Sequence, residues 1–526
     1  MTTTRAVWLF LALLTVIRWT LIGTMDLAFD EAHYWMWSER LAPAYFSKGP
    51  GVAYAIWSSV AILGPTEFGV RFLSPVAGMA TSLLLYYFAR RLFSEATGFW
   101  TVIALNVIPI FNIGSFVMTT DTLSVFFWVA AMFTFWLALE KSPQFSWHWP
   151  ITGFLIGLGF LSKYTNALQL ISVVMVLALV PRLQREYRRP GVWLLLLAFI
   201  ICVIPPVVWN AQRGWPTVGH LRNRGSLDQP LGIHPGELLS FLSMHFAVYS
   251  PLLFLALAWA VIASWPSTRQ NFKKLFLLWL GLPVFGLYFL LSFFHHASNA
   301  NWDGLAFLSF GILAVSYWRE RIESHPQLLR WATAAFVLSL LCSLVALDTD
   351  LLHVVGINPS KKDPSDRMRG WTTATKAVEQ VRAEVEQQLG EKVFMIADER
   401  ARASEFAFYF KDKRIEGPGH PPVYIVESQD IVNQFSFWPR YDQFVEAPAA
   451  AKNETGGDVY TEENGVNPFE GRDAIYIQNS SREAPRNITA AFQSTDYYRT
   501  IEVRRFGRIV RTLQVYICKN YKTLPL

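Results

Sequence analysis

The chain has 526 residues, of which 52% are apolar and only 16% are charged, and its formal net charge is +6. Soluble domains carry about one quarter charged residues, so this composition excludes an ordinary soluble protein and indicates a membrane protein. The basic residues stand in short gaps between apolar runs, without a basic-aromatic motif, which argues against nucleic-acid binding. The three cysteines form neither a disulfide framework nor a paired-cysteine zinc motif.

Apolar runs along the first two thirds of the chain predict about eleven transmembrane helices. They cover residues 6–24, 69–89, 97–116, 122–139, 150–162, 167–181, 191–209, 241–264, 275–294, 303–318 and 329–347. Short or proline-broken runs are tolerated where the freed backbone lines a polar cavity. The first run is expected to be a retained helix, because Arg18 interrupts it and no small-residue cleavage motif follows. The predicted fold is a mainly α-helical, polytopic bundle.

Arginine and lysine gather in alternate gaps between the predicted spans, most densely at residues 90–91 and 182–189. Gaps that are rich in these residues face the cytoplasm. This alternation predicts a cytoplasmic N-terminus and a C-terminal segment on the opposite side of the membrane.

The composition changes near Asp348, which divides the chain into a membrane domain, 1–348, and a predicted extracytoplasmic domain, 349–526. In the second part charges are frequent and Thr373–Leu389 has helical spacing. Strand-sized apolar runs occur at Val393–Ala397, Val423–Val426 and Ala474–Ile477. This pattern predicts a small α/β domain. The Ala447–Asn467 segment is interpreted as an exposed loop.

The loop after the first predicted span carries two adjacent carboxylates, Asp30 and Glu31, followed by His33, Tyr34 and two tryptophans. Carboxylates at the face of a bilayer are costly unless they have partners or a task. Such a pair can take the proton of an acceptor hydroxyl or hold a cation. The alternative is structural, with Asp30 capping a short interfacial helix and Glu31 in its first turn.

Further charged residues occur at the same predicted face of the membrane. Lys48 lies in a Ser-Lys-Gly-Pro turn, Asp121 begins one span and Lys163 follows another. Each has a structural alternative: Asp121 as an N-cap, Lys163 as a snorkelling side chain, and Glu67 with Arg71 as a helical i,i+4 pair. Together they bring carboxylates and cations to one face, which suits an anionic, lipid-linked substrate.

In their order along the chain, these motifs resemble the bacterial dolichyl-phosphate-mannose protein mannosyltransferase-like family, which includes the aminoarabinose transferase of lipid A. The matching motifs are Asp30-Glu31-x-x-Tyr34, Glu67-Phe68-x-x-Arg71, Thr120-Asp121, Ser162-Lys163-Tyr164, Trp209-Asn210-Ala211-Gln212 followed by Trp215, His220 and Arg224, Asn301-Trp302, and in the tail Asp363-Pro364, Gly370-Trp371 and Ala407-Phe408-Tyr409. The resemblance covers nearly the whole chain. It implies a type C glycosyltransferase of the bacterial inner membrane, with its active site on the outer face. The implied donor is a polyprenyl-monophosphate sugar whose anomeric centre is inverted.

The resemblance also implies roles for individual residues. Asp30 is expected to be the base that activates the acceptor, with Asp121 as a second catalytic carboxylate and Glu31 beside them. The expected phosphate-binding residues are Lys48, Lys163, Arg222, Arg224 and His33. The expected substrate pocket contains Tyr34, Glu67, Arg71, His220, Asn301 and Trp302. His33 stands where the aminoarabinose branch has an arginine, and Ser47 where it has a glutamate. For Arg222 and Arg224, a solvated loop is the alternative.

No cofactor and no metal site are predicted. His295 and His296 near Asp303 have no third ligand at a fixed spacing, and they are interpreted as a polar helix end. The predicted partners are the lipid-linked sugar donor, an extracytoplasmic acceptor (lipid, glycan or protein) and membrane lipid. A transporter or flippase for lipid-linked sugars is the alternative function, with its charges lining a transport route. The position of the charges in outer loops favours the enzyme.

Overall fold

The computed structural model describes residues 2–296, 299–354, 356–357, 363–443, 467–479 and 483–523. Contacts divide the chain into two compact units. The membrane unit comprises Met1–Thr24 and Leu41–Ser365, and the C-terminal unit comprises Met25–Arg40 and Asp366–Leu526. The segment Met25–Arg40 therefore packs with the C-terminal part of the chain, although it directly follows the first helix. The Ala447–Asn467 loop predicted from the sequence lies, except for Asn467, outside the described residues.

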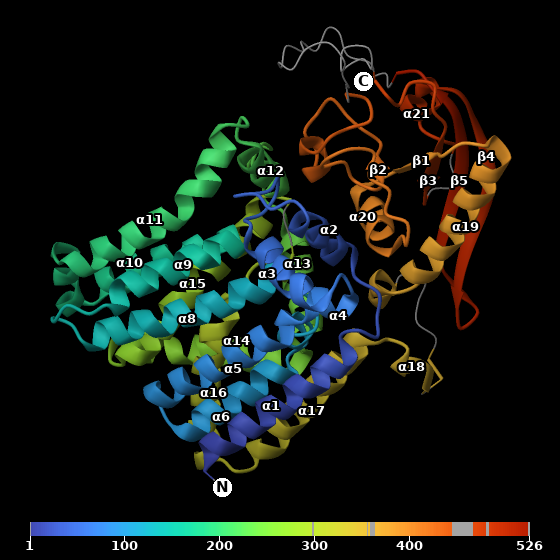
Figure 1. Cartoon of the computed structure of the whole chain (residues 1–526). Helices are drawn as coiled ribbons and strands as arrows, with labels where there is room; N and C mark the ends of the chain where they lie inside the picture. The colour runs from blue at the N-terminus through green and yellow to red at the C-terminus, as the bar shows by residue number, and fades with distance from the viewer. Residues whose placement is uncertain are drawn as a thin grey trace. The chain divides into compact units, whose positions relative to one another are not determined.

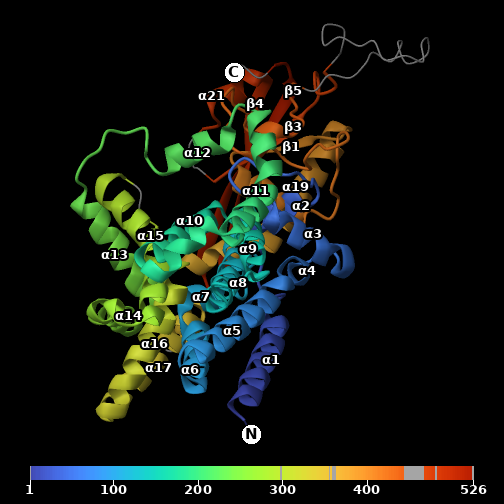
Figure 2. The same ribbon diagram turned by 90° about the vertical axis from the view of Figure 1, so that its left-hand side faces the viewer.

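Every run predicted to be a span contains helix in the membrane unit (Figures 1 and 2). Its α-helices are α1 (Thr3–Leu21), α3 (Gly51–Leu63), α4 (Glu67–Arg71), α5 (Leu73–Leu92), α6 (Glu95–Val107), α7 (Pro109–Gly114), α8 (Thr120–Glu140), α9 (His148–Ser162), α10 (Leu168–Leu179), α11 (Pro190–Ala211), α12 (Pro216–Arg224), α13 (Pro235–Tyr249), α14 (Pro251–Ser264), α15 (Phe272–Phe294), α16 (Ala306–Ser324), α17 (Leu328–Leu347) and α18 (Leu351–Val354). The 3-10 helices η1 (Tyr164–Ala167), η2 (Pro181–Arg188) and η3 (Trp265–Arg269) lie between them, and η4 (Pro364–Met368) precedes the first long helix of the C-terminal unit.

Within the described part of the chain, seven helices are long and apolar enough to cross a membrane, or eight if one bent pair counts as a single span. The other predicted spans are shorter or broken helices, except α16, which has 19 residues but is charged at its C-terminal end. Pro109 begins α7 and separates it from α6, and Pro251 begins α14 and separates it from α13. A proline at the first helical position favours a new helix, because its missing N–H has no helical partner there. The α11 helix, in contrast, continues through Pro205 and Pro206.

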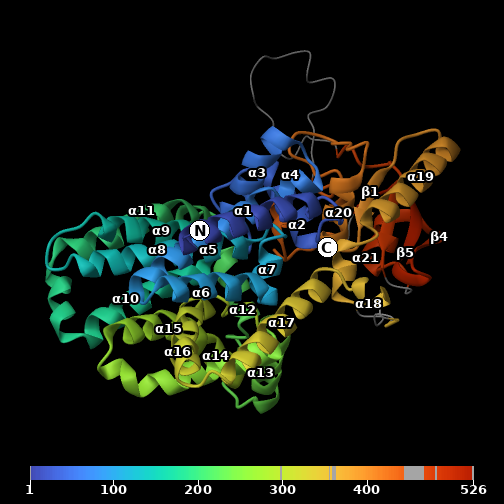
Figure 3. The same ribbon diagram turned by 90° about the horizontal axis from the view of Figure 1, so that it is seen from below.

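Aromatic and branched side chains fill the interior of the membrane unit. Helices α8, α9 and α11 pack side by side, α14, α15 and α16 form a second group, and α10 packs against α15 (Figure 3). Trp128, Phe135 and Phe276 are fully or almost fully buried in the core that these helices share. This arrangement confirms the predicted multi-helix bundle and fixes the helix ends that carry the charged motifs.

The C-terminal unit contains a five-stranded sheet in the order β2-β1-β3-β5-β4. The strands are β1 (Phe394–Ala397), β2 (Tyr424–Ile425), β3 (Ala474–Gln478), β4 (Phe492–Arg505) and β5 (Arg508–Tyr521). The β1 strand is parallel to β2 and β3, whereas β5 is antiparallel to β3 and β4. The helices are α2 (Phe29–Ser38), α19 (Trp371–Leu389), α20 (Arg400–Tyr409) and α21 (Arg486–Ala491). The predicted strands β1, β2 and β3 and the predicted helix α19 are confirmed, and the β4–β5 hairpin is an addition.

Candidate functional site

An ion pair joins two of the predicted site residues at one end of the membrane unit. The Lys163 Nζ lies 2.5 Å from Oδ1 of Asp121, and the lysine side chain is 9% exposed against 37% for the aspartate. Thr119, not Asp121, is the N-cap of α8, and its backbone N–H donates to Thr122 Oγ1 at 3.3 Å. Asp121 therefore lies in the first turn of α8, where the helix dipole stabilises a carboxylate.

The turn that carries Lys48 packs on the same end of α9. A Cβ at Gly49 would lie 2.1 Å from the carbonyl oxygen of Leu161, and one at Gly51 would lie 2.8 Å from Ser162 Oγ. Only glycine permits so close an approach. The turn is closed by a hydrogen bond from the Tyr45 N–H to the Lys48 carbonyl, at 3.1 Å. Lys48 and Lys163, which are far apart in the sequence, thus lie on neighbouring turns.

Aromatic residues extend this charged cluster. The Tyr288 hydroxyl lies 3.0 Å from the Thr165 hydroxyl, and the Tyr288 ring packs against Trp302 with centroids 5.5 Å apart. The Arg224 guanidinium lies over Trp302, 5.3 Å from the ring centroid. Arg222, in contrast, is exposed and forms an ion pair with Asp228. The structure therefore brings Arg224 and Trp302 together; Asn301, beside Trp302, is exposed.

The α12 helix contacts the chain just before the Lys48 turn. The Thr217 hydroxyl donates to the Tyr45 carbonyl at 3.4 Å, and the His220 ring packs against Phe46 with centroids 4.9 Å apart. The predicted pocket residue His220 is therefore a neighbour of the Lys48 turn.

Glu67 and Arg71 lie in α4. Thr66 caps this helix by accepting from the Gly69 N–H, and Glu67 occupies its first turn. Arg71 is 1% exposed, and its Nη1 donates to the Ile22 carbonyl at 2.8 Å. This contact ties α4 to the end of α1.

Sequence reasoning missed a buried acid–base pair, His245 and Asp303. Both side chains are fully buried, and His245 Nε2 lies 2.9 Å from Asp303 Oδ2. Among the described residues, Asp303 Oδ1 and the Tyr249 hydroxyl have no hydrogen-bond partner. The Asp303 carboxylate also acts electrostatically on Lys163. Asp303 directly follows the Asn301-Trp302 motif, and this position could have drawn attention to it in the sequence. His245 gives no such signal, because it lies inside an apolar helix.

The remaining predicted residues lie on α2 in the C-terminal unit. Asp30 is half-buried, whereas Glu31 is fully buried and accepts the Ala28 N–H at 2.9 Å. Tyr34 is 7% exposed and packs edge-on against Trp37, with centroids 5.0 Å apart. The N-cap of α2 is Ala28, so Asp30 does not cap the helix as the structural alternative expected; Glu31 lies in the first turn, as that alternative did expect.

His33 is buried, and both of its ring nitrogens have partners. Nδ1 lies 3.0 Å from Ser404 Oγ, and Nε2 accepts from Trp37 Nε1 at 3.2 Å. Burial, with Arg400 nearby, lowers the pKa of His33 well below its usual value. A neutral imidazole engaged on both sides offers no positive charge to a phosphate, so this geometry favours a structural role over the predicted phosphate contact.

No group of three or more His, Cys, Asp or Glu side chains that could hold a metal ion occurs within the described ranges. His295 and His296 contact residues other than Asp303. His295 Nδ1 is 3.1 Å from the Ser226 carbonyl oxygen, and His296 Nδ1 is 3.7 Å from Glu237.

The fold and the apolar helices define a multi-pass membrane protein with a small α/β unit. The model of the family described as dolichyl-phosphate-mannose-protein mannosyltransferase matches residues 47–209. The chain is 29% identical over 292 residues to the lipid A galacturonosyltransferase RgtD of Rhizobium johnstonii, covering 55% of this chain and 60% of that protein. It is 27% identical over 247 residues to the undecaprenyl phosphate-alpha-4-amino-4-deoxy-L-arabinose arabinosyl transferase of Erwinia tasmaniensis, covering 44% of this chain and 42% of that protein.

The fold is also similar to a solved structure, that of ArnT from Cupriavidus metallidurans. The apo state superposes with a TM-score of 0.59 at 13% identity, covering 98% of both chains. The undecaprenyl phosphate-bound state of the same protein gives a TM-score of 0.57 at 13% identity, covering 97% of both chains. The chain is thus similar in sequence to mannosyltransferase-like and aminoarabinose-transferase-like membrane glycosyltransferases, and similar in fold to ArnT. Its sequence match spans about 60% or less of the two relatives.

Proposed function

We propose that this protein transfers one sugar from a polyprenyl-monophosphate donor to an acceptor outside the cytoplasm, with inversion at the anomeric carbon. The observation that carries the proposal is the packing of the Lys48 turn on the Lys163 end of α9, beside Asp121. Two lysines and a carboxylate at helix ends suit an anionic group that is attached to a lipid. The undecaprenyl phosphate bound by the similarly folded ArnT supports a donor of this class.

The reaction follows from ordinary acid–base chemistry. An acceptor hydroxyl attacks the anomeric carbon, and its proton passes to the Asp30 carboxylate. The bond between the anomeric carbon and the phosphate oxygen breaks, and its electron pair leaves with the polyprenyl phosphate. Cations near that oxygen stabilise the growing negative charge, which is the role assigned to Lys48 and Arg224.

The Asp121–Lys163 pair has a separate task in this proposal. Because Asp121 already compensates the charge of Lys163, this lysine attracts a phosphate less strongly than an unpaired lysine would. We assign Asp121 to the reacting centre as the second carboxylate, held in place by Lys163. Holding both lipid-bound substrates at one membrane face lowers the barrier through orientation.

The acceptor in this proposal is a glycolipid of the outer face of the inner membrane. The name of one relative, a lipid A galacturonosyltransferase, supports lipid A as the acceptor class. The positively charged gaps between spans support an N-terminus in the cytoplasm and a C-terminal unit outside it.

A direct assay tests this function. Purified protein in nanodiscs is incubated with a polyprenyl-phosphate donor whose sugar is radiolabelled, together with a lipid A acceptor. The proposal predicts label on the acceptor and free polyprenyl phosphate in equal amounts. Movement of intact donor across proteoliposome membranes, without cleavage, would instead identify a transporter.

A further inference from the structure

The helix that carries Asp30 folds as part of the C-terminal unit. Eight of the ten residues of α2 are buried. The clearest polar link between α2 and the tail joins His33 to Ser404 of α20, with 3.0 Å between Nδ1 and Oγ. Ser404 is itself fully buried, so this contact is shielded from water. His33 and Ser404 are 371 positions apart in the sequence.

Just before α2 begins, the chain forms hydrogen bonds with the rest of the C-terminal unit. The Asp26 carboxylate accepts from the Trp371 N–H at 2.7 Å and from the Thr372 hydroxyl at 2.6 Å. These groups belong to the first turn of α19, where backbone N–H groups lack helical partners. The Leu27 N–H donates to the Tyr409 hydroxyl at 2.7 Å. Asp26 therefore acts as a capping residue for a helix far along the chain.

Just after α2 ends, Arg40 forms a second set of contacts with the same unit. The Arg40 guanidinium donates to the carbonyl oxygens of Gly419, at 2.9 Å, and His420, at 2.7 Å. It also lies over the Trp438 ring, 4.9 Å from the centroid. Contacts at both ends fix the direction of the helix axis.

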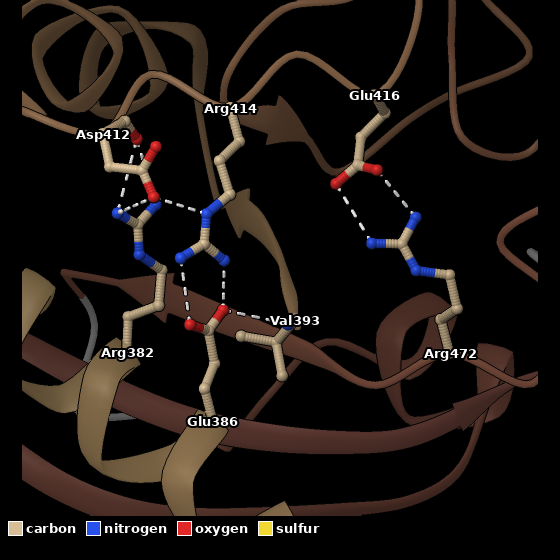
Figure 4. A network of polar contacts seen from close by, with 7 residues as sticks. All are labelled: Arg382, Glu386, Val393, Asp412, Arg414, Glu416 and Arg472. Atoms are coloured by element: carbon tan, nitrogen blue, oxygen red, sulfur yellow. Dashed lines mark hydrogen bonds and ion pairs between the residues drawn. The ribbon is translucent and has the colours of Figure 1, made fainter. Parts of the chain in front are cut away.

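Between these ends, Trp35 packs edge-on against Phe408, with centroids 5.0 Å apart, and the Lys413 ammonium lies 4.3 Å from the Trp35 centroid. The segment around Lys413 is held by ion pairs. Arg414 pairs with Glu386 and with Asp412, as Figure 4 shows. The same picture shows Arg472 with both Glu416 carboxylate oxygens, at 2.8 and 3.1 Å. The segment that carries Lys413 is therefore anchored to α19 through the Arg414–Glu386 ion pair.

A helix of ten residues is not stable alone, because isolated helices shorter than about 12–15 residues are marginal in water. The tail therefore determines that α2 forms and how it is oriented. Asp30 lies one turn before His33, so the position of its carboxylate depends on the His33–Ser404 contact.

We propose that the C-terminal unit positions Asp30 for the reaction, with Asp26, His33 and Ser404 as positioning residues that act through α2. This inference rests on the proposed function, in which Asp30 is the base. The tail performs no chemistry itself. It converts a short, otherwise unstable loop into a fixed support for the base, as catalytic groups require.

The test uses the full chain in nanodiscs and the sugar-transfer assay. Ser404→Ala removes the hydroxyl that contacts His33, and we expect kcat to fall about tenfold or more, since small misplacements of catalytic groups are costly. The donor KM should change less than about twofold, because no phosphate contact is lost. Asp26→Ala should act in the same way, and Asp26→Asn should recover most of the rate because asparagine caps about as well.

A double-variant cycle separates positioning from general damage. In an Asp30→Asn background, Ser404→Ala should cause no further loss of kcat, because there is no base left to position. Equal fractional losses in both backgrounds would overturn the inference, as would a normal kcat for Ser404→Ala. Thr375→Val is the matched control, since Thr375 is buried in α19 of the same unit and its hydroxyl has no partner among the described residues. It should leave kcat unchanged.

The outcomes also distinguish this inference from the proposed function. An inactive Asp30→Asn protein with a fully active Ser404→Ala protein would overturn the positioning role alone. A fully active Asp30→Asn protein would overturn the base assignment and, with it, the positioning role.

Discussion

Lys163 and Asp121 form an ion pair whose two members differ in exposure. The Lys163 Nζ is 2.5 Å from Asp121 Oδ1, with the lysine side chain 9% exposed and the aspartate side chain 37% exposed. The pair joins the start of α8 to the end of α9. Removing one partner leaves the other uncompensated, which costs more than removing both.

This asymmetry predicts how variants bind the donor lipid. Lys163→Met leaves the Asp121 charge near the phosphate, so we expect the Kd for polyprenyl phosphate to rise about tenfold through repulsion. Adding Asp121→Asn removes that charge and should restore most of the affinity. Binding is measured by titration calorimetry in nanodiscs. A double variant that binds as weakly as Lys163→Met would contradict the pairing.

The close approach of the Lys48 turn to α9 gives a second prediction. In Gly49→Ala, the new Cβ meets the Leu161 carbonyl oxygen at 2.1 Å, so the turn must shift. We expect the donor KM to rise at least about fivefold, because Lys48 loses its position on the phosphate. Gly311→Ala is the control, since a Cβ there has nothing within 4 Å and alanine favours the helix. Identical kinetics for the two variants would argue against a role for the turn.

The sequence predicted the membrane bundle well because its signal is local. An apolar run becomes a helix wherever its backbone cannot bond to water, so every predicted span contains helix. The number of full-length spans was less predictable. Prolines such as Pro109 and Pro251 divide apolar stretches that look continuous by composition alone.

The features that sequence reasoning missed are non-local or only partly buried. The β4 strand is mostly exposed or half-buried and carries several charges, so it gives no apolar run. The docking of α2 on the tail joins positions such as His33 and Ser404, which are far apart in the sequence. His245 meets Asp303 only through the tertiary fold, since it lies within an apolar helix.

A buried carboxyl in the C-terminal unit predicts a pH dependence. Arg440 is paired with Asp442 through contacts of 2.8 and 2.6 Å and also lies 3.4 Å from the Glu427 carboxylate, so two buried carboxyls share one guanidinium. Burial raises the pKa of Glu427 from 4.5 to about 8. The folded state therefore keeps a proton that the unfolded state releases between these values, and stability falls as the pH rises through this window.

The measurement compares the thermal unfolding of the wild-type chain and Glu427→Gln between pH 6 and pH 9. We expect the wild-type Tm to fall over this range relative to the variant, because glutamine does not titrate. Parallel Tm curves for the two proteins would mean that Glu427 does not hold a proton in the folded state.

The predicted orientation is tested with single cysteines in a background in which Cys202, Cys342 and Cys518 are replaced by alanine. Gln184 in η2 and Lys392 after α19 are both exposed, so neither substitution disturbs a core. In intact spheroplasts, an impermeant thiol reagent should label Lys392→Cys and spare Gln184→Cys. Labelling of Gln184→Cys alone would reverse the orientation and place the Asp121 end of the bundle in the cytoplasm.

The assignment of Asp30 as the base is tested by the rate of Asp30→Asn. Asparagine keeps the shape of the side chain and most of its hydrogen-bonding capacity, but it cannot accept the acceptor's proton. The measurement is single-turnover sugar transfer from a labelled polyprenyl-phosphate donor, using equal amounts of folded wild-type and variant protein in nanodiscs. We expect the rate to fall about 10²–10⁴-fold, the range typical of general acid–base catalysis. A near-normal rate of transfer by Asp30→Asn would contradict the account and return Asp30 to a structural role at the start of α2.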